Sequence, residues 1–255
     1  MKTKLSIILT ISLCATCFAA CSNRSVTPAA STAIDAESNL AVLGVSEDMG
    51  KSYIDSFVFF GESTTYHLKS RGVLSGGKNT GQVLGNESGT AILDADTVST
   101  QVIYPETGET MTFCEAIRLM RPKYLFMSFG LNGAATKIKR GEDYFKGCYR
   151  TLIEKVREVS PDTKIILGSC YPVAENMDMS RYTITLDELN GAIATLNGWT
   201  AELCAEVDAR YLNLCEVLTD EQGRLRLEYQ VGDGHHLNVT AYMKILEYIR
   251  THGYK

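Results

Sequence analysis

Four short apolar runs, separated by longer amphipathic segments, constrain the fold of this chain most strongly. The runs cover residues 56–60, 123–129, 164–168 and 210–214, and Gly61 and Gly130 end the first two. Runs of this length and composition are typical of buried strands. The segments between them carry apolar residues at three- and four-residue steps, the spacing of one helix face. Strands that alternate with helices favour a parallel sheet with helices on both sides.

Helices are predicted over residues 64–71, 142–159, 187–207 and 239–250. In residues 142–159, the side chains of Phe145, Tyr149, Leu152 and Val156 share one face. Pro161 then prevents the helix from continuing. Asn238 is the predicted N-cap of the last helix. Residues 51–255 contain no internal repeat and are long enough for one substantial core, so we expect a single folded domain there.

The N-terminus has the composition of an export signal. A basic start, Met1–Lys4, precedes an apolar run from Leu5 to Ala20. The following Cys21 completes Phe-Ala-Ala-Cys, which resembles the bacterial lipobox, where the Cys is lipidated after cleavage. We therefore expect a signal peptide over residues 1–20, a lipidated Cys21 that begins a flexible tether over residues 21–50, and an exported, membrane-anchored protein. Some order within the tether is expected near Leu40–Val45. An ordinary signal peptide with an incidental Cys is the alternative.

Charge limits the partners of the exported chain. Loss of Lys2 and Lys4 with the signal moves the formal net charge from −5 to −7. This charge gives no support to nucleic-acid binding and would repel an anionic lipid surface. Membrane contact is therefore expected through the lipid anchor alone, and we expect a monomer.

Five cysteines lie beyond Cys21. Their number is odd and their spacing wide, which predicts no metal site and leaves any disulfide pairing open. They are Cys114, Cys148, Cys170, Cys204 and Cys215.

Three polar clusters occupy positions where a parallel sheet forms its ligand crevice. Ser63 follows the first strand at a predicted strand-to-helix turn, which suits a nucleophile because a helix N-terminus stabilises negative charge. Asn132 follows the second strand, and its amide can donate to an oxyanion. Asp233 and His236 share the loop before the last helix, where a carboxylate can orient an imidazole. Taken singly, each cluster also fits a helix cap or a turn.

Together, a Ser, an Asn and a final Asp-x-x-His in this order resemble the SGNH (GDSL-like) hydrolase superfamily, from about Phe57 to the C-terminus. The resemblance implies a flavodoxin-like three-layer α/β/α sandwich with a central parallel sheet. It also implies a catalytic triad of Ser63, Asp233 and His236, with His235 as a neighbour. No metal or organic cofactor is implied.

The resemblance assigns the oxyanion hole to the N–H of Ser63, the N–H of a glycine and the side chain of Asn132. Gly85, which follows Val83-Leu84, is the predicted glycine, and Gly81 is the alternative. The chain departs from the family pattern at two places. Glu62 replaces the usual Asp before the nucleophile. Gly133 replaces an Asp that commonly braces the Asn loop, which puts the rigidity of that loop in question.

The function expected from the resemblance is hydrolysis of acyl esters, with short groups such as acetyl on carbohydrate or cell-wall glycan as the first choice. Hydrolysis of lipids or lysophospholipids is the rival within the class. Tyr66, Tyr104 and Tyr171 lie near the predicted crevice and could stack on a sugar, although a Tyr is as often half-buried packing. The same fold could also serve a non-catalytic glycan-binding lipoprotein or an acyltransferase, because a fold does not by itself fix a function.

Overall fold

The computed structural model describes residues 41–86, 88–89 and 91–254. The predicted signal peptide, Cys21 and most of the predicted tether lie outside these residues. At the centre is a five-stranded parallel sheet in the order β2-β1-β5-β6-β7. Its strands are β1 (Phe57–Gly61), β2 (Val83–Leu84), β5 (Tyr124–Ser128), β6 (Lys164–Gly168) and β7 (Arg210–Leu212).

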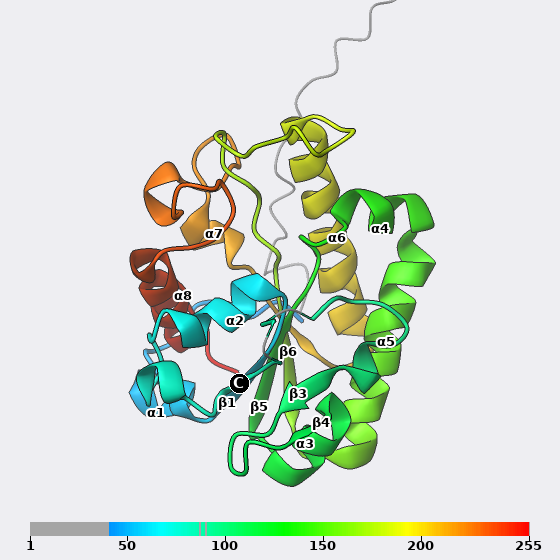
Figure 1. The fold of residues 1–255 in the computed structure, drawn as a ribbon, viewed down its shortest axis with the longest axis vertical. Helices are drawn as coiled ribbons and strands as arrows, with labels where there is room; N and C mark the ends of the chain where they lie inside the picture. Colours follow the sequence, from blue (N-terminus) through cyan, green and yellow to red (C-terminus); the bar gives the residue numbers. More distant parts are fainter. Residues whose placement is uncertain (1–40, 87, 90, 255) are drawn as a thin grey trace, which may run out of the picture. The chain divides into compact units, whose positions relative to one another are not determined.

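Helices cover both faces of this sheet (Figure 1). The helices α1, α2 and α8 lie on one side, and α3, α5 and α6 lie on the other. Taken in chain order, the parallel strands follow the flavodoxin-like sequence 2-1-3-4-5. The predicted three-layer sandwich is therefore confirmed. The helices are α1 (Gly50–Asp55), α2 (Ser63–Ser70), α3 (Phe113–Met120), α4 (Ala134–Arg140), α5 (Glu142–Val159), α6 (Leu186–Glu206), α7 (Cys215–Leu218) and α8 (Val239–Thr251).

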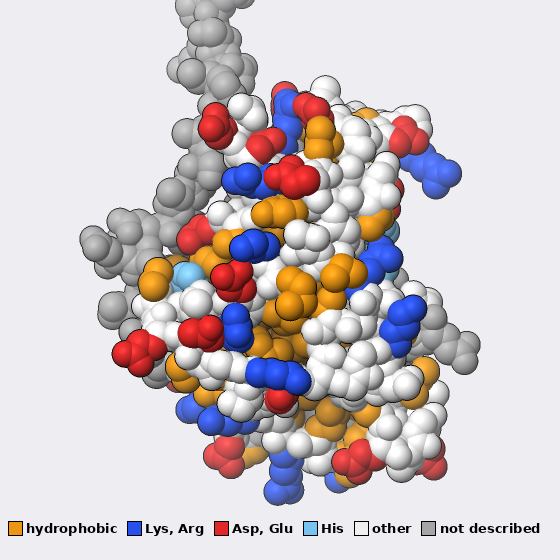
Figure 2. All heavy atoms as spheres, turned by 90° about the vertical axis from the view of Figure 1, so that its left-hand side faces the viewer, with side chains coloured by type: hydrophobic (Ala, Val, Ile, Leu, Met, Phe, Trp, Pro, Cys, Tyr) orange, Lys and Arg blue, Asp and Glu red, His pale blue; other side chains and the backbone are white. Residues whose placement is uncertain are grey.

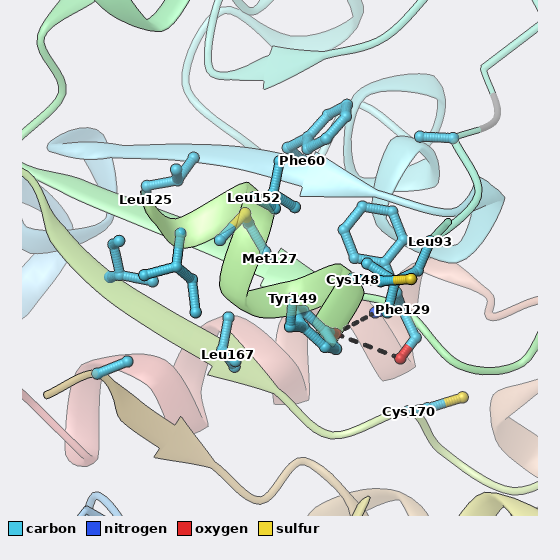
Figure 3. Packing of buried hydrophobic residues seen from close by; sticks show 14 of the residues in the cluster. Phe60, Leu93, Leu125, Met127, Phe129, Cys148, Tyr149, Leu152, Leu167 and Cys170 are labelled. Carbon is cyan, nitrogen blue, oxygen red and sulfur yellow. Dashed lines mark hydrogen bonds between the residues drawn. The ribbon is translucent and has the colours of Figure 1, made fainter. Parts of the chain in front are cut away.

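The strands are continuous apolar runs because both faces of the sheet are buried. In β1, Phe57 and Phe59 pack on the α1, α2 and α8 side, while Val58 and Phe60 pack on the α3 and α5 side. Figure 3 shows the second of these cores, in which Tyr149 of α5 reaches the backbone of Phe129 at the end of β5.

Cap chemistry explains where the helices begin. Thr112 and Glu115 form a capping box at the start of α3, and Thr185 and Glu188 form another at the start of α6. The predicted N-cap is confirmed for α8, since the Asn238 side chain accepts a hydrogen bond from the Ala241 N–H at 3.1 Å. Helix α5 has the predicted bounds.

The predicted tether is corrected at its end. Residues 41–43 are buried, Val42 pairs with Tyr211 beside β7, and α1 begins at Gly50. The last ten residues of the segment predicted as tether therefore belong to the packed domain. Further features were not predicted: the two-residue β2, the hairpin of β3 (Gln101–Ile103) and β4 (Thr110–Thr112), and the short helices α1, α3, α4 and α7.

No helix in the described part of the chain is long and apolar enough to cross a membrane. The five cysteines beyond Cys21 are all free.

Candidate active site

Ser63 is the first residue of α2, directly beyond the carboxyl end of β1. Its backbone N–H belongs to the first turn, where helix geometry provides no intrahelical acceptor. The turn into the helix is tight because Gly61 lacks a side chain: a Cβ there would collide with the Ser128 carbonyl oxygen and the Thr65 hydroxyl. The half-buried Ser63 Oγ lies 3.2 Å from His236 Nε2.

Asp233 holds the other side of the His236 ring. Asp233 Oδ2 lies 2.7 Å from His236 Nδ1, and Asp233 Oδ1 accepts the backbone N–H groups of His235 and His236 at 3.1 and 2.9 Å. Partial burial raises the pKa of Asp233, but these N–H groups and the His236 ring outweigh it and bring the pKa to about 2. The carboxylate is therefore ionised at neutral pH and favours the Nδ1–H tautomer of His236.

Gly234 sets the path of this loop. Its φ is +82°, a conformation that favours glycine, and a Cβ would lie 2.5 Å from Met177 Cα. The Gly234 carbonyl also accepts a hydrogen bond from the Ala174 N–H at 2.7 Å. The loop after β6 thus packs directly against the loop that carries Asp233 and His236.

The two other predicted oxyanion residues follow the strands on either side of β1. Asn132 lies in the loop between β5 and α4, and its N–H donates to Glu62 Oε2 at 3.0 Å, which ties it to the residue before Ser63. Gly85 follows β2 at the carboxyl edge of the sheet. Gly81 lies before β2, where a Cβ would meet Pro105. The topology therefore favours Gly85 over Gly81.

The second turn of α2 carries Tyr66, one of the aromatic residues expected near the crevice, and His67, which the sequence did not predict there. The Tyr66 ring lies against both Gly85 and Gly89: a Cβ at either glycine would come within 2.7 or 2.5 Å of ring carbons. The centroid of the His67 ring lies 4.7 Å from that of the His236 ring. The four-residue spacing from Ser63 to His67 is the signal that could have found His67, because residues three and four apart share one helix face.

His67 is a neutral neighbour of His236. Burial, the nearby His236 and the guanidinium of Arg71 lower the pKa of His67 to about 4. Its Nδ1 is buried with no hydrogen-bond partner among the described residues. A neutral ring leaves His236 free to accept a proton without a fixed positive charge beside it.

A hollow of about 470 Å³ lies elsewhere in the described structure. Phe57, Gln82 and Pro122 line it at the amino ends of the strands. Ligands of open parallel sheets bind at the carboxyl ends of the strands, and the Ser63 hydroxyl and the His236 imidazole meet there. We therefore place the site at Ser63 and not in this hollow.

Asp233, His235 and His236 are also close enough to be considered as metal ligands, with one atom of each within 4.8 Å of the others. The Asp233 oxygens, however, already receive hydrogen bonds from both backbone N–H groups and lie beside His236 Nδ1. This geometry suits a carboxylate that orients an imidazole.

A parallel α/β sandwich that brings a Ser, a His and an Asp together at the carboxyl edge of its sheet has the arrangement of a candidate serine-hydrolase site. The model of the GDSL-like lipase/acylhydrolase family matches residues 59–244, well over half of the chain. The chain belongs to this family and is a hydrolase of ester bonds. A comparison with curated proteins finds no match.

Several solved structures are similar to this chain at low sequence identity. A DUF4886 family protein of Bacteroides uniformis is 12% identical with a TM-score of 0.49, over 78% of this chain and 83% of that one. The periplasmic domain of a Salmonella Paratyphi A lipopolysaccharide acetyltransferase is 16% identical with a TM-score of 0.42, over 70% of this chain and 72% of that one. A GDSL-like lipase of Bacteroides thetaiotaomicron is 21% identical with a TM-score of 0.35, over 52% of this chain and 66% of that one.

The pKa of His67 predicts a pH-dependent contribution to stability. Its folded value of about 4 lies below its ordinary value of 6.5, so the unfolded chain binds more protons between these limits. The free energy of unfolding should therefore fall as the pH drops from 6.5 to 4, by about 2 kcal/mol from this group after allowance for partial exposure. Below pH 4 its contribution stays constant.

Urea unfolding of the parent and His67→Phe at pH 4 to 7 measures this contribution. The difference between the two free energies of unfolding should change across the window. Parallel curves for the parent and His67→Phe would contradict the assignment.

Proposed function

We propose that this protein is an exported, lipid-anchored serine esterase in which Ser63 is the nucleophile, His236 the general base and Asp233 the residue that orients His236. In this proposal, residues 1–20 are the signal peptide, Cys21 carries the lipid, and the substrate is a short acyl ester, such as an acetyl group, on carbohydrate or cell-wall glycan.

The observation that supports the triad most directly is its continuous hydrogen-bond geometry. Ser63 Oγ is 3.2 Å from His236 Nε2, and His236 Nδ1 is 2.7 Å from Asp233 Oδ2. His236 takes the proton from Ser63 as the oxygen attacks the ester carbonyl, and Asp233 stabilises the imidazolium that forms. His236 then gives this proton to the departing alcohol. In the second half of the reaction it activates a water that releases the acyl group.

The oxyanion would be met by the Ser63 N–H, the Gly85 N–H and the Asn132 side chain. Support comes from their position: all three follow strands that end at the same edge of the sheet. Such donors act strongly because they are already oriented before charge develops on the carbonyl oxygen.

Exposure of the triad favours an ester carried on a bulky molecule. The Asp233 side chain is 39% exposed and the His236 side chain 24%. An ester that projects from a polymer reaches a site of this kind without the polymer entering a deep cavity. Tyr104 and Tyr171 are buried core residues and do not offer stacking surfaces to a sugar.

A second candidate substrate class is favoured by exposed apolar side chains near the His loop. Leu227 and Val231 precede the loop, and Val239 and Met243 lie one turn apart on α8. The Val231 N–H donates to the His236 carbonyl, and the Asn238 N–H donates to the Tyr229 carbonyl, so the two segments are adjacent. Figure 2 shows apolar side chains gathered on the side of the molecule that carries α8. Such a surface suits the chain of a lipid ester.

Substitution of Ser63 tests the esterase proposal. The parent should release p-nitrophenol from p-nitrophenyl acetate, and Ser63→Ala should lower kcat by about a thousandfold or more because the nucleophile is lost. Ser70→Ala, an exposed serine at the end of the same helix, is the control and should match the parent. Equal background rates in the parent and Ser63→Ala, with both folded by circular dichroism, would instead support the non-catalytic binding protein.

Acyl-chain length separates the two substrate classes. With p-nitrophenyl esters, we expect kcat/KM to be highest for acetate and to fall as the chain lengthens, and Met243→Ser to leave this order unchanged. The opposite order, together with a drop on long-chain esters in Met243→Ser but not in Leu119→Ser, an exposed apolar control on α3, would favour the lipid substrate.

A further inference from the structure

Glu62 is a buried carboxylate between the proposed nucleophile and the loop that carries Asn132. It is 1% exposed and immediately precedes Ser63. Its Oε1 accepts the Gly130 N–H and its Oε2 accepts the Asn132 N–H, both at 3.0 Å. The Glu62 side chain therefore holds both ends of the segment 130–132 beside Ser63.

Lys137 completes this arrangement from α4. It is 5% exposed, and its ammonium donates to the Asn132 carbonyl oxygen. Asn132 is thus held by its N–H through Glu62 and by its carbonyl through Lys137. With both peptide groups fixed, the direction in which the Asn132 side chain leaves the backbone is fixed as well.

The hydrogen-bond donors around Glu62 suit its charged form. Burial raises the pKa of Glu62 above its ordinary value, and the N–H groups of Asn132 and Gly130 and the charge of Lys137 offset only part of that rise. Each carboxylate oxygen faces an N–H donor, whereas a protonated carboxyl would bring an unwanted donor to this cluster. A buried charge of this kind is costly, which argues that it is kept for more than packing.

Lys137 lies beside the position of the missing Asp. Gly133 stands where the family pattern has an Asp that braces the loop, and its φ is +76°. A Cβ at Gly133 would lie 3.5 Å from Lys137 Nζ, an ordinary van der Waals contact. The ammonium of Lys137 therefore borders the position at which an Asp side chain would begin.

We propose that Glu62 and Lys137 are a positioning pair that holds Asn132 so that its side-chain amide meets the oxyanion. This inference rests on the proposed function. Neither residue touches the substrate; both act through the backbone of Asn132. Below the loop, the Tyr149 hydroxyl, 3.2 Å from the Phe129 nitrogen, fixes the strand end from which it starts (Figure 3).

Substitutions of Glu62 test the pair. Glu62→Gln removes the charge and places an amide N–H₂ against the backbone donors, so kcat for p-nitrophenyl acetate should fall about 10- to 100-fold while KM stays within about twofold. Glu62→Asp keeps the charge and should recover part of that loss. The exposed Glu175→Gln is the matched control and should behave as the parent.

Lys137→Met should lower kcat in the same way, and the exposed neighbour Lys139→Met on α4 should not. Because the pair acts on one residue, the double variant Glu62→Gln/Lys137→Met should lose much less than the product of the two single losses. The melting temperature of Glu62→Gln should fall, because the variant leaves Lys137 buried without the carboxylate that faces it, so kcat is compared well below that temperature.

Amide hydrogen exchange at Gly130 and Asn132 measures the rigidity of the loop without turnover. Both amides should exchange faster in Glu62→Gln than in the parent, with the core amides of β5 unchanged. Unchanged exchange would overturn the bracing of the loop by Glu62. Parent-like kcat in Glu62→Gln, with a Ser63-dependent parent, would overturn its positioning role. If the parent shows no Ser63-dependent activity, the proposed function is refuted, and the positioning role of Glu62 in catalysis is refuted with it. This holds for either result of the hydrogen-exchange measurement.

Discussion

The parallel pairing of β1 with β5 is the constraint on which the site depends. Its register sets Gly61 opposite Ser128, so both strands end at the same edge of the sheet. Because Gly61 has no side chain, the chain leaving β1 runs close against the Ser128 carbonyl. The segments that carry Ser63 and Asn132 therefore emerge side by side. The buried carboxylate of Glu62 spans the short distance between them.

The imidazole reaches this edge from the far end of the chain. Ser63 and His236 are 173 positions apart, and two hydrogen bonds besides their own connect the neighbouring segments. The Tyr242 hydroxyl of α8 donates to the Thr64 carbonyl at 2.6 Å, and Arg71 Nε donates to the Leu237 carbonyl at 3.3 Å. These contacts set the start of α8 against α2. Within its own loop, His236 is oriented locally, by Asp233 and by the conformation of Gly234.

The sequence predicted the features that have a local or periodic signature. Buried strands and the helix of residues 142–159 follow from hydrophobic spacing, and the Asp233–His236 pair follows from proximity along the chain. The two-residue β2 and the β3–β4 hairpin are too short to show a period. Packing of residues 41–43 on β7 depends on contacts with a strand far along the chain. The contacts of Glu62 with the Asn132 loop, and of His67 with His236, likewise exist only once the sheet has formed.

The central claim is that Ser63 is a nucleophile activated by His236 and Asp233. The most direct measurement is reaction of the purified protein with a fluorophosphonate, with the adduct located by peptide mass spectrometry. We predict a single adduct on Ser63 in the parent, with labelling slowed at least about a hundredfold in His236→Ala because the general base is removed. An adduct on another residue, or equal labelling of Ser63 in both proteins, would contradict the account.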